Sequence, residues 1–85
     1  MSYRVELARS ADRELWRLPE PYRTKVFRVI KLLGEDPRSS GSKKLKGSKD
    51  AWRIRLGPYR ILYTVQDVLR IVRVESVGDR KDVYR

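Results

Sequence analysis

The segment of residues 51–60 constrains the fold of this chain more than any other stretch. In its first half, apolar residues alternate with basic ones: Trp52, Ile54 and Leu56 against Arg53 and Arg55. Successive side chains of a β-strand point to opposite faces. The pattern therefore predicts a strand with one apolar face and one basic face, and only a structure that buries the first face can accommodate it.

Gly57-Pro58 predicts a tight reversal after this strand, and the residues from Tyr59 to Tyr63 predict a second strand running back. If the turn holds an even number of residues, Arg55 lies directly opposite Arg60. Like charges at opposed positions destabilise a sheet. A fold has no need of such a pair, whereas a surface that binds anions does.

Composition excludes several classes of function. The 85 residues contain no cysteine and no histidine, so disulfides, the usual zinc ligands and the usual general base are all missing. The N-terminus lacks the apolar stretch of a signal peptide, and no run of residues approaches the length of a membrane span. We expect a cytoplasmic protein with no cofactor, no metal and no membrane partner.

The net charge of +10 is concentrated in the C-terminal half. Residues 1–38 hold nine basic and six acidic residues, a net of +3, whereas residues 39–85 hold twelve and five, a net of +7. Such an excess attracts polyanions, of which nucleic acid is the commonest. A solvated surface that only confers solubility is the plainer interpretation of the same charge.

The rest of the chain predicts a strand at residues 3–8, two helices, a polar loop and a final strand. We expect Ser10 to cap the first helix, Pro19-Glu20-Pro21 to separate the two helices, and Gly34 to end the second. The second helix carries one apolar stripe: Tyr22, Val26, Val29, Ile30 and Leu33. Residues 36–42 predict a polar loop and 43–49 a basic segment, while Gln66-Asp67 predicts a turn before a strand at 68–77.

This order, strand, two helices and three strands (β-α-α-β-β-β), predicts an α+β fold. We expect one domain over residues 1–85, with both N-terminal helices packed on one face of a small antiparallel sheet. Trp52, Tyr59 and Tyr63 are then core residues, and Arg53, Arg55 and Arg60 are left on the opposite face.

That opposite face is the candidate site. Arginine holds phosphate oxygens through two parallel hydrogen bonds and keeps its charge. It also stabilises the charge that develops when a phosphodiester is attacked. Arg80 follows the last strand just after Gly78, which can bend the chain sharply. Tyr84 follows four residues later and could stack on a nucleobase. Asp79 and Asp82 are weaker candidates for acid–base chemistry.

Four stretches in this order resemble the RelE branch of the RelE/ParE toxin superfamily: Lys44-Leu45-Lys46-Gly47, Trp52-Arg53-Ile54-Arg55, Tyr59-Arg60-Ile61-Leu62-Tyr63, and Val77-Gly78-Asp79-Arg80 followed by Val83-Tyr84. The resemblance covers nearly the whole chain. It implies a RelE-like fold and a ribosome-dependent endoribonuclease that cuts mRNA in the ribosomal A site by attack of the ribose 2′-hydroxyl, leaving a cyclic phosphate and a 5′-hydroxyl and so inhibiting translation.

The resemblance also implies roles for residues. Arg60 would hold the scissile phosphate, Arg80 would stabilise the transition state or protonate the leaving oxygen, and Tyr84 would orient the substrate. Arg53 and Arg55 would assist the same step, where the family commonly has basic residues. The residues expected to bind RNA or the ribosome are Lys44, Lys46, Lys49 and Lys81. The implied partners are the ribosome, mRNA and a cognate antitoxin with an acidic segment that folds on binding.

The sequence departs from the family at two points. Some members continue with a further helix after the tyrosine, but this chain ends at Arg85. Arginine also replaces lysine at positions 53 and 55, which favours electrostatic stabilisation over proton transfer there. Two alternatives stay open: a ParE-like toxin that inhibits DNA gyrase without cutting RNA, and an inactive basic RNA-binding relative.

Overall fold

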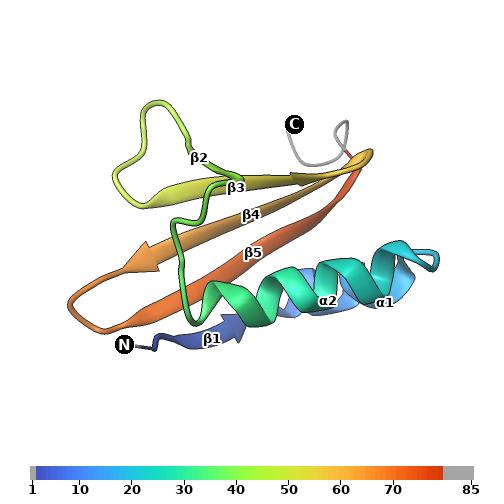
Figure 1. Cartoon of the computed structure of the whole chain (residues 1–85), viewed down its shortest axis with the longest axis horizontal. Coiled ribbons are helices and arrows are strands. Elements are labelled where there is room, and N and C mark those ends of the chain that lie inside the picture. The colour runs from blue at the N-terminus through green and yellow to red at the C-terminus, as the bar shows by residue number, and fades with distance from the viewer. Residues whose placement is uncertain (1, 80–85) are drawn as a thin grey trace.

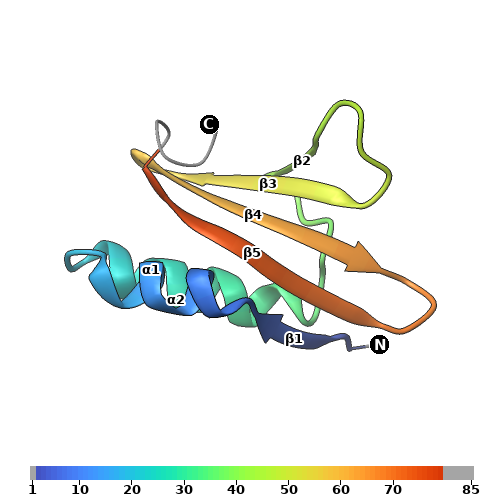
Figure 2. The ribbon, with the colours of Figure 1, turned by 180° about the vertical axis from the view of Figure 1, so that it is seen from behind.

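A computed structural model of the chain describes residues 2–79. The elements in chain order are β1 (Arg4–Leu7), α1 (Arg9–Arg17), α2 (Tyr22–Leu33), β2 (Ser42–Lys44), β3 (Ala51–Leu56), β4 (Tyr59–Gln66) and β5 (Ile71–Asp79). Figures 1 and 2 show both helices on the same side of the sheet, so one sheet face is packed against helices and the other is not. Neither helix is long and apolar enough to cross a membrane.

The strands form one sheet in the order β1-β5-β4-β3-β2. β1 runs parallel to β5, and all other neighbours are antiparallel. The predicted α+β class is confirmed, with two additions. The sheet is mixed because β1 pairs with the last strand of the chain. It also has a fifth strand, β2, because residues 42–44 pair with β3 where a loop and a basic segment are predicted.

The hairpin of β3 and β4 has the predicted register. Arg55 lies opposite Arg60 and Leu56 opposite Tyr59, so the loop is the two-residue Gly57-Pro58. Gly57 has a φ of 60°, which suits glycine at the first position of such a turn. A Cβ on Gly57 would lie 2.7 Å from Cε1 of Tyr22 in α2. The turn is therefore fixed by its own backbone and by the helix beside it.

The first helix differs from the prediction at its start. It begins at Arg9, and Ala8 stands at the cap position without a side-chain hydrogen bond. Ser10 therefore lies inside the helix, and its hydroxyl donates instead to the carbonyl oxygen of Glu75 in β5, at 3.5 Å. A serine at a helix start also signals a cap in sequence, but here the neighbouring strand offers the acceptor.

The second helix has the predicted apolar stripe, with Val26, Ile30 and Leu33 buried. Gly34 ends it as predicted, although its φ of −66° is helical. The site is tight, because a Cβ there would lie 3.1 Å from the carbonyl oxygen of Tyr3 and 3.2 Å from Cγ2 of Val5. The Tyr3 amide donates to the Gly34 carbonyl oxygen at 2.7 Å and so joins the start of β1 to the end of α2.

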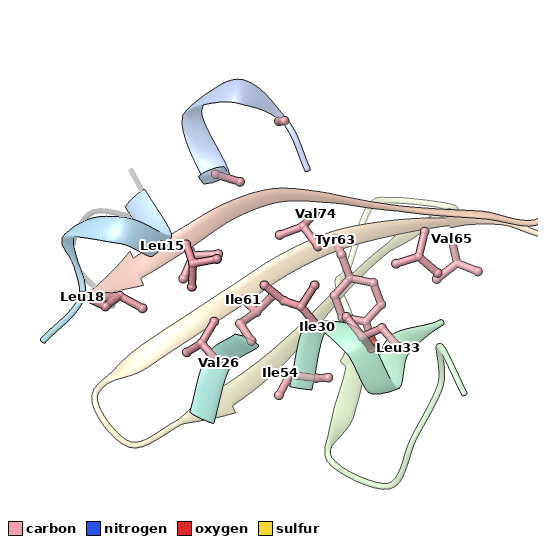
Figure 3. Close-up of a cluster of buried hydrophobic side chains, with 14 residues drawn as sticks. Leu15, Leu18, Val26, Ile30, Leu33, Ile54, Ile61, Tyr63, Val65 and Val74 are labelled. Carbon is pink, nitrogen blue, oxygen red and sulfur yellow. The ribbon is translucent and has the colours of Figure 1, made fainter. Parts of the chain in front are cut away.

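The core lies between the helices and the facing side of the sheet. Figure 3 shows Ile61 and Tyr63 of β4 directed at Val26, Ile30 and Leu33 of α2. Tyr63 is 1% exposed, and its hydroxyl donates to the carbonyl oxygen of Pro37 at 2.7 Å. This bond satisfies the one polar atom of a buried ring and ties the loop before β2 to the core. Trp52 and Tyr59 pack against the core as predicted.

The last strand is displaced from its predicted range of 68–77. β4 extends through Gln66, a turn occupies residues 67–70, and β5 begins at Ile71. Val68 and Leu69 are 96% and 65% exposed in that turn. At the other end, β5 continues through Gly78 to Asp79 instead of bending at the glycine. Val68 and Leu69 are apolar, so the sequence predicts the strand too early. Gly78 suggests a bend in the sequence, although it lies inside β5.

Candidate nucleic-acid interface

The sheet face opposite the helices, called the outer face below, carries the predicted arginines. Ile61, Tyr63 and Val65 of β4 point into the core, so Arg60, Leu62 and Thr64 point the other way. The register then gives three rows of cross-strand neighbours. The first is Arg55–Arg60–Gly78, the second is Lys43–Arg53–Leu62–Ser76, and the third is Ala51–Thr64–Arg73–Glu6. The prediction that Arg53, Arg55 and Arg60 share one face is confirmed.

The three arginines differ in exposure. Arg55 is exposed and Arg53 half-buried, whereas Arg60 is only 4% exposed. Its cross-strand neighbours are Arg55 and Gly78. Because Gly78 has no side chain, it leaves room beside the long side chain of Arg60. Arg60 is therefore almost completely enclosed, whereas Arg55 beside it is open to solvent.

The structure separates the lysines predicted to bind RNA. Lys44 lies opposite Trp52 and so sits at the edge of the helix-facing side. Lys46 and Lys49 are exposed in the connection between β2 and β3. Lys43, which the sequence interpretation did not select, lies opposite Arg53 on the outer face. Only the pairing of β2 could have revealed this, because a three-residue strand within a basic segment has no periodicity of its own.

One end of β5 is held by α1 in place of a strand. β1 pairs with β5 only as far as Val74, and beyond it Glu75 is a bulge, since Leu62 faces Ser76 while Tyr63 faces Val74. Beyond the bulge, the Val77 amide donates a hydrogen bond to the Glu14 carboxylate at 2.9 Å. Glu14 thus positions the strand end that carries Gly78. No local pattern in the sequence indicates this bond, because it joins residues 63 positions apart.

A cleft of about 280 Å³ lies beside this strand end on the helix side. Its polar lining includes Glu14, Arg17, Tyr59 and Asp79. Asp79 lies opposite Tyr59 and not opposite Arg60, so it points away from the row of Arg55 and Arg60. The three predicted site residues Arg80, Lys81 and Tyr84, together with Asp82, lie outside the described residues.

The opposite end of the outer face carries arginines that are paired with carboxylates. Arg73 lies 3.9 Å from a carboxylate oxygen of Glu6 and 3.4 Å from one of Glu75, and Arg4 lies 3.2 Å from Glu6. These side chains are 37–72% exposed, so each pair contributes little to stability. Their effect is to neutralise the arginines of this end.

The titrating groups with shifted pKa values are structural. The bidentate bond from Arg38, with Nη2 at 2.7 Å, is the main reason why the pKa of Asp67 is lowered, and the Tyr3 hydroxyl at 2.6 Å adds to it. Burial raises the pKa of Tyr63, so this tyrosine holds its proton. Within residues 2–79 no cluster of carboxylates could hold a metal ion. The outer face carries the fixed cations Arg53, Arg55 and Arg60 at its basic rows.

Comparison with known proteins agrees with this geometry. Residues 5–84 match the family of the ParE toxin of the type II toxin–antitoxin system parDE. A protein of Escherichia coli described as a RelE-like toxin is 32% identical over 88 residues, covering 99% of this chain and 92% of that protein.

Two solved structures share the fold over nearly the whole chain. The isolated RelE toxin of E. coli superimposes with a TM-score of 0.81 at 31% identity, covering 98% of this chain and 92% of that one. The archaeal RelE–RelB complex from Pyrococcus horikoshii gives a TM-score of 0.81 at 27% identity, covering 94% and 97%. By its match to the family model, its sequence identity and its fold, the chain belongs to the ParE toxin family of type II toxin–antitoxin systems and is a RelE-like toxin.

Proposed function

We propose that this toxin is a metal-independent endoribonuclease that cuts mRNA in the ribosomal A site. The observation that carries the proposal is the row Arg55–Arg60–Gly78 on the outer face. Two arginines at directly opposed positions cost the fold stability. An RNA phosphate placed between them is attracted by both guanidinium groups, and this attraction offsets their mutual repulsion.

The reaction is attack by the ribose 2′-hydroxyl on the adjacent phosphate, with a 5′-hydroxyl leaving and a cyclic phosphate formed. Arg60 holds the scissile phosphate, and its donors match two phosphate oxygens at once. Arg55 and Arg53 lie on the same face and stabilise the negative charge that builds up on those oxygens. Since arginine does not exchange its proton near neutral pH, these three residues act through charge and position.

The remaining roles fall on the C-terminal tail. Arg80 stabilises the transition state, including the charge that develops on the leaving oxygen, and Tyr84 orients or stacks on the substrate. Both lie outside the described residues, so the proposal for them rests on the family resemblance. The tail follows Asp79 directly, and the Glu14–Val77 hydrogen bond fixes the strand from which it departs.

The partners in this proposal are the ribosome with its mRNA and a cognate antitoxin. The RelE structure from P. horikoshii is a complex with RelB, which supports an antitoxin for this chain too. With a net charge of +10, the toxin favours an acidic antitoxin segment that covers the end of the outer face where Arg55 and Arg60 lie. Such a segment would bind in place of RNA.

The test is to map mRNA 5′ ends on translating ribosomes with and without the protein. We expect new ends within the A-site codon, little cleavage of naked RNA, and a strong loss of the new ends with Arg60→Ala. Arg73→Ala is the matched control, an arginine on the same face whose partners are carboxylates.

The second candidate is a ParE-like toxin that inhibits DNA gyrase without cutting RNA. The description of the matched family names ParE, but the similar proteins and solved structures are RelE-like, so this candidate is not better supported. Gyrase-dependent DNA damage with unchanged mRNA ends, insensitive to Arg60→Ala, would replace the ribonuclease proposal with this one. If both mRNA and DNA stay intact and expression is harmless, the chain is an inactive RNA-binding relative.

A further inference from the structure

Leu62 is an apolar residue at the centre of a polar and basic surface. It lies in the second row of the outer face, between Arg53 on β3 and Ser76 on β5. This row is adjacent to the row of Arg55, Arg60 and Gly78. The other outer positions of β4 are Arg60, Thr64 and Gln66, so Leu62 interrupts an otherwise polar strand face.

Leu62 lies outside the hydrophobic core of the described residues. Leu62 is half-buried, yet it belongs neither to the buried core nor to the partly buried side chains that pack against that core. Ile61 and Tyr63, its chain neighbours, fill the core from the opposite face. Isolated apolar residues are common on protein surfaces, so the position of Leu62 beside Arg60 carries the argument.

The spacing of the rows suits a nucleotide. Neighbouring outer positions on one strand are about 6.6 Å apart, two residues at the rise of a β-strand. A phosphate held at Arg60 therefore brings its attached nucleoside to the level of Leu62. There, the leucine offers an apolar floor to the face of a base, and the planar guanidinium of Arg53 can stack beside it. Ser76 offers a hydroxyl that both donates and accepts hydrogen bonds.

We propose that Leu62 and Ser76 form a nucleobase subsite next to the scissile phosphate, in which Leu62 supplies contact area and Ser76 contributes to the choice of base. The subsite rests on the proposed ribonuclease function and deepens it, because it gives the toxin a source of codon preference within its own sheet. RNA bases that are unstacked and presented singly are the usual targets of such contacts.

The experiment measures single-turnover cleavage on ribosomes programmed with a panel of A-site codons. Leu62→Ala should lower kcat/KM about tenfold on all cleaved codons, as loss of an apolar substrate contact does. Leu62→Phe should keep or raise it, since aromatic rings stack on bases. Ile71→Ala is the matched control: Ile71 is half-buried and outside the core, and it lies opposite Gln66 on the same face. It should leave kcat/KM unchanged.

Ser76→Ala should change the ratio of rates between codons that differ in one base. Thr64→Ala, the hydroxyl control on the neighbouring row, should leave that ratio as it is. Thermal unfolding of each variant separates a substrate effect from a folding effect.

The outcomes distinguish a failure of the subsite proposal from a failure of the ribonuclease proposal on which it rests. If the wild-type protein cuts no codon, the ribonuclease proposal is wrong and the subsite is wrong with it. If the wild type cuts but Leu62→Ala matches it in rate and Ser76→Ala matches it in codon ratio, the subsite is wrong and the ribonuclease stands. Equal losses of kcat/KM in Leu62→Ala and Ile71→Ala also overturn the subsite proposal, since the loss then reflects a change in the whole sheet.

Discussion

The two ends of the outer face use the same residue type in opposite ways. At one end, here called the basic end, Arg60 has Arg55 and Gly78 as its cross-strand neighbours. At the other, the paired end, Arg73 has Glu6 and Thr64, and an ion pair joins it to Glu75 as well.

Both ends are built on strands β4 and β5, so sheet geometry does not explain the difference. The paired end balances its own charge and needs no ligand. The basic end places two arginines at directly opposed positions, and such a concentration of positive charge is typical of surfaces that bind anions. The two ends therefore differ in whether an arginine has a carboxylate as its cross-strand neighbour, as Arg73 does and Arg60 does not.

Removal of Arg60 should have the largest effect. Arg60→Ala should lower the rate of A-site cleavage by about 100-fold or more, the usual loss when one group that stabilises a transition-state oxyanion is removed. Arg73→Ala should stay within about twofold of the wild type, because an exposed ion pair contributes under about 1 kcal/mol. Single-turnover cleavage on programmed ribosomes measures both rates.

Arg60 is buried, so its loss could also weaken the fold. Arg60→Lys addresses this, since it keeps the charge and most of the volume but loses the planar fork of donors. It should fold and still cut slowly. Equal rates for Arg60→Ala and Arg73→Ala in folded proteins would remove the distinction between the two ends.

The basic end can be converted into a paired end by one substitution. Arg55→Glu places a carboxylate opposite Arg60, as Glu6 lies opposite Arg73. The free energy of unfolding should rise by about 0.2–1 kcal/mol, the range of cross-strand charge pairs, while cleavage should fall at least tenfold because the carboxylate competes with the phosphate for Arg60. Denaturant unfolding and the ribosome assay measure the two changes. A variant that is less stable and equally active would show that Arg55 and Arg60 do not share an anion.

Much of this comparison could be predicted from the sequence, because it rests on strand alternation. The placement of Trp52, Ile54 and Leu56 against Arg53 and Arg55 followed from a period of two, and the register of Arg55 and Arg60 followed from a two-residue turn. Local patterns of this kind need no knowledge of the rest of the chain.

Long-range pairing was not predictable in the same way. The side of the sheet on which Lys43 and Lys44 lie depends on β2 joining β3, and three residues carry too little pattern to indicate it. The bond from Glu14 to Val77 joins residues 63 positions apart. It exists because β1 is too short to cover β5, which no property of either segment reveals by itself.

The Glu14 bond gives a smaller but specific prediction for the basic end. Glu14→Ala leaves the Val77 amide without its acceptor and loosens the strand end that carries Gly78 beside Arg60. The rate of cleavage should fall several-fold with the affinity for ribosomes nearly unchanged, because the groups that carry charge are still present. Glu14→Gln should restore the rate, since its side-chain carbonyl accepts the same bond. A matched loss in Glu14→Gln would mean that the carboxylate charge matters and not the hydrogen bond.

The smallest effect is expected at the paired end of the sheet, where Asp67 in the β4–β5 turn accepts bonds from Arg38 and Tyr3. These bonds lower the pKa of Asp67 in the folded state. A lowered pKa means that the folded protein binds this proton less readily than the unfolded chain, so Asp67 stabilises the fold above its ordinary pKa. That contribution is lost as the pH falls from there through the lowered value.

Asp67→Asn has no carboxyl group at this position, so the difference in stability between the wild type and this variant isolates the effect of the titration. The melting temperature of the wild type should exceed that of Asp67→Asn at neutral pH, and the gap should close on acidification below about pH 4, the ordinary range of an aspartate. Cleavage at neutral pH should be the same in both proteins, because the turn lies away from Arg60. A gap that persists into strong acid would mean that Asp67 stabilises the turn through its shape and not its charge. A loss of cleavage would mean that the paired end takes part in binding RNA.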